Sequence, residues 1–139
     1  MPSEPISDPV DPASEALDLA HLFHGLSLAL DQFLLSDQLP ADTPPEEQAL
    51  LRQQAQDLED VSHDFTAEAI KAILESIQPD LAKIKGVTKE AKAQVGHLKT
   101  VSKVISIAAA GLSVGTAIVS GNPLAIGKAV EEFGKEVVG

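Results

Sequence analysis

The chain has 139 residues, of which 44% are hydrophobic, 22% are charged and 3% are aromatic, and it contains no cysteine. This length fits one modest domain, and the lack of cysteine excludes disulfide bonds, thiolate catalysis and Cys-ligated metal centres. Ten basic residues against 21 acidic ones give a formal net charge of -11, which argues against binding to nucleic acid because phosphate contacts need clustered cations.

The N-terminal residues are rich in proline and acids, and we expect residues 1–12 to form a disordered tail. They have neither the cationic start nor the apolar run of a secretory signal, which favours a soluble, cytoplasmic protein that is at most peripheral to a membrane. Residues 13–139 are expected to form a single helical domain.

The first helix is predicted at about residues 12–35, because Asp11 and Pro12 provide an N-cap and a proline at the first helical position. Apolar side chains then recur at spacings of four and three along one helical face, at Leu19, Phe23, Leu26, Leu30 and Phe33. Other leucines widen this face, so we expect the helix to be packed on more than one side.

A second helix is predicted at about residues 44–77, because residues 43–46 resemble a capping box with a proline just inside it. Good helix formers fill residues 46–76, which contain neither Gly nor Pro. Pro79 is expected to interrupt the helix, since proline lacks an amide hydrogen, and a third helix is predicted at about 79–103.

An apolar residue recurs every seven positions across these helices. Such a register predicts a long, coiled-coil-like central helix or a set of collinear helices. It continues past Pro79 and Gly86, so the sequence leaves open whether the helix is continuous there. The members are Ile70, Ile77, Ile84, Ala91, Leu98, Ile105, Leu112 and Val119.

Charge is sorted along the chain. Residues 1–64 hold 14 acids and one arginine, a net charge of -13, whereas residues 65–139 hold nine lysines and seven acids, a net charge of +2. Five lysines are predicted to share one helical face, namely Lys85, Lys89, Lys92, Lys99 and Lys103. Either they stay solvated or face acids of a neighbouring helix, such as Asp57, Glu59, Asp60 and Asp64, or they attract an anionic membrane surface or an acidic partner.

Residues 104–127 carry no charge, and a helix is predicted at about 104–120. This length is at the lower limit for a membrane span, so the helix is either a buried element of a soluble bundle or a membrane-contacting one. Glycines four apart allow a second helix to approach closely. The residues expected at this membrane or partner surface are Ile105, Ile107, Gly111, Leu112, Gly115, Ile118 and Val119.

The sequence around Gly121, Asn122 and Pro123 predicts a helix exit, a cap and a new helix start. A final amphipathic helix is predicted at about residues 123–137. Residues 104–139 are therefore expected to form an apolar helical hairpin rich in small residues.

Pairs of histidine and carboxylate are the remaining candidates for chemistry. Asp18 and His21 are three residues apart, as are Asp60 and His63, a spacing that puts both side chains on one helical face. A metal site would require the two pairs to meet and further carboxylates, such as that of Glu68 or Glu75, to join them. No nucleophile elbow, P-loop or dinucleotide-binding motif occurs, so we expect no enzymatic activity and no cofactor.

We therefore expect an all-α protein of three to five helices, with a long coiled-coil-like central helix and an apolar C-terminal hairpin. The predicted function is that of a non-enzymatic interaction module that self-associates or binds a larger protein partner, with residues 104–139 as a conditional membrane-contacting element. The alternatives are a small metal-binding helical bundle and an acidic adaptor or immunity-type protein that masks a basic partner.

Overall fold

Six α-helices and no strands make up the described part of this computed structural model, which comprises residues 12–37, 39–98 and 100–138. The helices are α1 (Pro12–Leu35), α2 (Pro45–Asp64), α3 (Ala67–Ser76), α4 (Gln78–Val95), α5 (Val101–Ser120) and α6 (Pro123–Val138). The predicted all-α class is confirmed. The predictions for residues 1–11 and for Lys99 lie outside the described residues.

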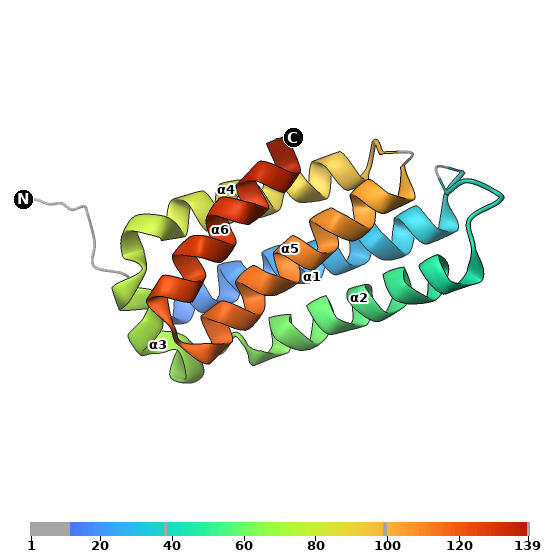
Figure 1. Ribbon diagram of the computed structural model, residues 1–139. Helices are drawn as coiled ribbons and strands as arrows, with labels where there is room; N and C mark the ends of the chain where they lie inside the picture. The colour runs from blue at the N-terminus through green and yellow to red at the C-terminus, as the bar shows by residue number, and fades with distance from the viewer. Residues whose placement is uncertain (1–11, 38, 99, 139) are drawn as a thin grey trace, which may run out of the picture.

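The helix α1 packs against α2, α3 and α4, while α5 packs mainly against α2 and α6. Figure 1 shows α1 and α2 side by side, with α5 running between α2 and α6. The prediction that the first helix is packed on more than one side is therefore confirmed. Its apolar stripe is fully buried at Leu19, Phe23, Leu26, Leu30 and Phe33.

The segment predicted as one helix over residues 44–77 is two helices, which is why the described residues hold six helices rather than three to five. The Thr66 side chain caps α3 by accepting a hydrogen bond from the Ala69 N–H at 3.1 Å. The preceding Phe65 is buried and its ring meets that of Phe23 edge to face, with centroids 5.1 Å apart. Capping and aromatic packing together favour this break over a continuous helix.

The predicted capping box at the start of α2 is wrong. Pro44 is the N-cap residue and no side chain caps the helix there. The Thr43 hydroxyl instead donates to the Pro40 carbonyl at 2.6 Å, and the Gln48 side chain donates to the Thr43 carbonyl at 3.0 Å. A proline in the first turn, Pro45, is present as predicted.

The predicted turn between α5 and α6 is confirmed. Gly121 has a φ of 76°, in the left-handed region that favours glycine. The Asn122 Oδ1 atom accepts hydrogen bonds from the backbone N–H groups of Leu124 and Ala125, at 3.1 and 3.3 Å. The boundary predicted at Pro79 is also present, because α3 ends at Ser76 and α4 begins at Gln78.

The seven-residue register is buried along α3 and α4 and lies at the edge of the core in α5. Its members Ile70, Ile77, Ile84 and Ala91 are buried, whereas Leu98, Ile105 and Leu112 are half-buried and pack against the core, and Val119 is 43% exposed. The helix boundary predicted at residue 103 lies earlier, because α4 ends at Val95 and α5 begins at Val101. Residues 70–119 are therefore divided among α3, α4 and α5 and do not form one long helix.

Candidate interaction surface

The two faces of α5 differ in character. Its buried face consists of Val101, Val104, Ile107, Ala108, Gly111, Val114, Gly115, Ala117 and Ile118. The opposite face exposes small side chains at Ala109, Ser113, Thr116 and Ser120. Of the residues predicted for a membrane or partner surface, Ile107, Gly111, Gly115 and Ile118 are buried, Ile105 and Leu112 are half-buried, and Val119 is exposed.

The two helical glycines of α5 allow close packing inside the protein. A Cβ atom at Gly115 would lie 2.6 Å from Val61 Cγ1 and 3.0 Å from the Phe23 ring. A Cβ atom at Gly111 would lie 3.2 Å from Leu26 Cδ2. The close approach that the glycine spacing predicts is therefore made between α5 and its own neighbours, α1 and α2.

An open groove of about 720 Å³ lies over the exposed face of α5, between α2 and α6. Its floor consists of Ala109, Leu112, Ser113, Thr116, Ala117 and Ser120 from α5. Its walls are Leu50, Gln54 and Asp57 from α2, and Ala125, Lys128, Ala129 and Glu132 from α6. Most of the floor residues are small, so another molecule can approach the α5 backbone closely there.

Gln54 is a buried polar residue in the groove wall that was not predicted from the sequence. Its side chain is 6% exposed, and its Nε2 donates to the Ile105 carbonyl of α5 at 3.2 Å. The Oε1 atom is buried and has no hydrogen-bond partner among the described residues. An acceptor left unpaired in this way lowers stability, because it has lost water without gaining a donor.

A large apolar side chain is exposed in the wall of the groove. Leu50, from α2, is 44% exposed. The exposed Val119 and Leu124 lie outside the groove lining, and Val119 lines a separate pocket with residues of α3. Exposed apolar surface in a concave site is typical of binding sites.

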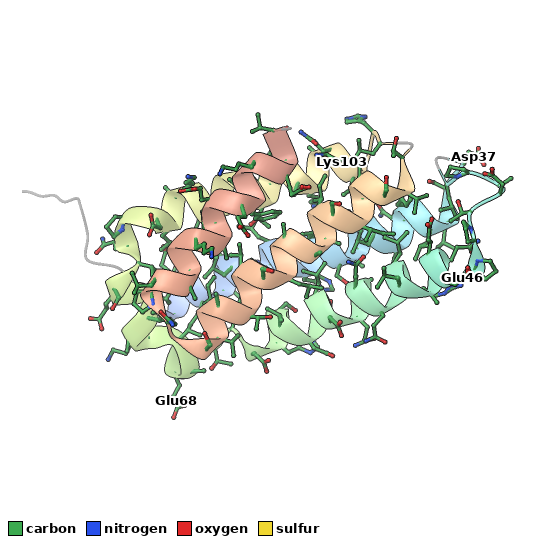
Figure 2. The ribbon with its side chains drawn as sticks, viewed as in Figure 1. Asp37, Glu46, Glu68 and Lys103 are labelled. Carbon is green, nitrogen blue, oxygen red and sulfur yellow. The ribbon has the colours of Figure 1, made fainter. Side chains whose placement is uncertain are left out.

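The predicted basic face is divided among the neighbouring helices. Lys85 forms an ion pair with Glu15 of α1 and another with Asp18 at 3.2 Å. Lys103, which Figure 2 labels, donates a hydrogen bond to the backbone carbonyl of Glu136 near the end of α6. Lys89 is exposed. The Lys92 side chain lies close to Gly25 of α1, because a Cβ atom built there would be 3.3 Å from its Nζ.

Lys85 therefore does face acidic residues of a neighbouring helix. These residues belong to α1, whereas the sequence predicted acids of α2. Burial lowers the pKa of Lys85, and the hydrogen bonds and charges of Glu15 and Asp18 more than offset this, so that its pKa is raised above the ordinary value. Because the folded-state pKa is raised, this stabilisation is fully present at neutral pH and is lost only as the pH rises through that raised pKa.

We expect Lys85→Met to lower the free energy of unfolding by about 1 kcal/mol at neutral pH, because it leaves two carboxylates of α1 without their cation. Urea denaturation followed by far-UV circular dichroism measures this difference. Lys83→Met, at an exposed position of the same helix, is the matched control and should change stability by much less. Equal losses for the two variants would contradict the role given to Lys85.

The histidine and carboxylate pairs do not assemble into a metal site. The described residues contain no group of three or more His, Asp or Glu arranged to hold a metal ion. Asp18 is engaged by Lys85, and Glu68 projects away from the bundle (Figure 2). His63 instead contacts Glu59 within α2 at 3.0 Å, and the same Glu59 contacts His24 of α1.

No family model matches this sequence, and no curated protein or solved structure matches it significantly. Its function is therefore inferred from its own residues and their geometry.

Proposed function

We propose that this chain is a non-enzymatic helical interaction module that self-associates or binds a larger protein partner. The observation that carries the proposal is the groove over α5, which has a floor of mostly small side chains and walls from α2 and α6. Helices pack most closely where small side chains line the contact, so this face of α5 is suited to receive another helix. The exposed Leu50 adds apolar surface that such a contact would bury.

The mass of the protein in solution tests this function. The monomer has a mass of 14.5 kDa. We expect a larger particle either in sedimentation equilibrium of the purified chain, which reports self-association, or in size-exclusion chromatography of an extract of cells that make it, which reports a partner. A monomer in both experiments would contradict the proposal.

A second candidate function is a conditional membrane contact by residues 104–139. It is favoured by α5, which among the described residues is the one helix long and apolar enough, by length and composition, to cross a membrane. Half of its apolar window is buried inside the bundle, so α5 would have to leave α1 and α2 before it could meet lipid. The same length and composition are also typical of the core helix of a soluble protein.

We expect Thr116→Lys to abolish any insertion, because it places a charge within the apolar helix. Thr116 is exposed, so the folded bundle tolerates the lysine. The measurement is co-flotation with liposomes of neutral and anionic lipid at low and physiological salt, with Ser102→Lys near the start of α5 as the control. If Thr116→Lys floats as well as the wild type, or if the wild type does not float at all, insertion is excluded.

A further inference from the structure

We propose that the groove over α5 docks one basic amphipathic helix of a partner protein, which presents Lys or Arg side chains to Gln54 and to the acidic residues of the walls. This inference rests on the proposed interaction function and specifies the kind of partner that the groove takes. Three properties of the groove support it: its shape, its unpaired acceptor and its charge.

The shape of the groove fits a helix. Its floor extends along α5 from Ala109 to Ser120, which corresponds to about 16 Å at the helical rise of about 1.5 Å per residue. About three turns of a second helix cover this length. The floor residues Ser113 and Thr116 are small enough for the backbone of such a helix to come close to α5.

The unpaired acceptor offers the occupant a hydrogen bond. Gln54 Oε1 is buried without a hydrogen-bond partner among the described residues, so a donor of the occupant reaches it when the Gln54 side chain turns toward the groove that it lines. The backbone N–H groups in the middle of a docked helix are already bonded within that helix, so the donor must be one of its side chains. Lys, Arg and Trp are the side chains that donate without also bringing an acceptor, and of these Lys and Arg also carry the charge that pairs with Asp57.

Charge selects a cationic helix over a second copy of this chain. Asp57 on the α2 wall and Glu132 on the α6 wall outnumber Lys128, and Asp57 lies one helical turn from Gln54. The whole chain has a net charge of -11, so two copies repel each other, whereas a cationic partner is attracted over a longer range. A Lys or Arg that reaches Gln54 can also pair with Asp57.

A helical peptide library tests this proposal, because it offers the groove many different helix faces at once. One face of a stable helical scaffold is randomised, displayed on phage, and selected on the wild-type protein with depletion on Ser113→Leu, which fills the floor of the groove. We expect the selected peptides to be enriched in Lys and Arg and to carry small residues at helical spacing. No enrichment over the depletion step, or enrichment in acidic or purely apolar residues, would overturn the proposal.

Binding of one selected peptide to two variants then tests the recognition itself. Ser113→Leu should weaken binding about tenfold or more because the larger side chain obstructs the floor, whereas Ser102→Leu, outside the groove on the same helix, should bind like the wild type. Gln54→Leu should bind about tenfold more weakly and yet unfold at a higher temperature, because it removes the unpaired oxygen. Unchanged binding by Gln54→Leu would overturn the role of this acceptor.

The failure of this inference is distinguishable from the failure of the proposed function. If the protein forms a larger particle in solution but the library yields no groove-dependent peptide, the interaction function stands and another face carries it. If the protein is monomeric in both mass experiments and the library is also unproductive, neither proposal stands.

Discussion

Gly115→Ala is expected to lower the free energy of unfolding by about 2 kcal/mol, whereas Gly86→Ala is expected to raise it by about 1 kcal/mol. Alanine is the better helix former at both positions, so the difference between the two results measures packing alone. The new methyl group at residue 115 would stand 2.6 Å from Val61 Cγ1, while nothing lies within 4 Å of the corresponding position at residue 86. Helices α2 and α5 would have to separate to admit it.

Urea denaturation of both variants, followed by far-UV circular dichroism because the chain has no Trp or Tyr, gives the two free energies. Gly111→Ala should fall between them, since its nearest neighbour is the flexible end of Leu26 at 3.2 Å. Stabilisation by Gly115→Ala would show that α5 does not pack against α1 and α2 as described.

Phe23→Ala is expected to destabilise the protein by about 3–5 kcal/mol. The ring is completely buried, packs edge to face on Phe65 and lies against Gly115, so its removal leaves a cavity where α1, α5 and the α2–α3 junction meet. A loss of this size is a large fraction of the stability of an ordinary domain.

Leu17→Ala is the matched control for Phe23→Ala, because Leu17 lies on the same helix and is 55% exposed. Its effect should stay below about 1 kcal/mol. Thermal and urea unfolding of the two variants separate a core position from a surface one. Similar losses for both would contradict the orientation of α1.

Much of the fold follows from local sequence. The boundary at Pro79 and the turn at Gly121 and Asn122 depend on backbone chemistry that a single residue provides, and both are present. The break at Phe65 could not be predicted in the same way. It depends on a contact between Phe65 and Phe23, which are far apart in the sequence. The one local signal is Thr66, a good N-cap residue.

The seven-residue register did not indicate that α4 and α5 are separate helices, because periodicity carries no information about a change of direction. Residues 96–100 contain one Gly and no Pro, so little in the local sequence marks the end of α4 and the start of α5. The exposed residues Ala109, Ser113 and Thr116 are small and uncharged like much of the buried face, so the sequence does not indicate which face of α5 is exposed. Which face of α5 is buried depends on where α1 and α2 lie.

The groove could not be predicted for the same reason, because its walls come from α2 and α6, which are far apart in the sequence. The sequence did contain one signal for Gln54. It is a polar residue at a core spacing, between Leu51 and Leu58, which are both buried. A polar side chain at such a position requires a partner, and here its nitrogen has one and its oxygen has none among the described residues.

The most direct test of the interaction function is photo-cross-linking in the cells that make the protein. A photoreactive amino acid replaces Ser113 on the groove floor or, as the control, Lys71 on the exposed surface of α3. If the groove is the docking surface, position 113 gives a discrete adduct of higher mass that is absent from position 71. No adduct at position 113, or the same adducts at both positions, would contradict this function for the groove.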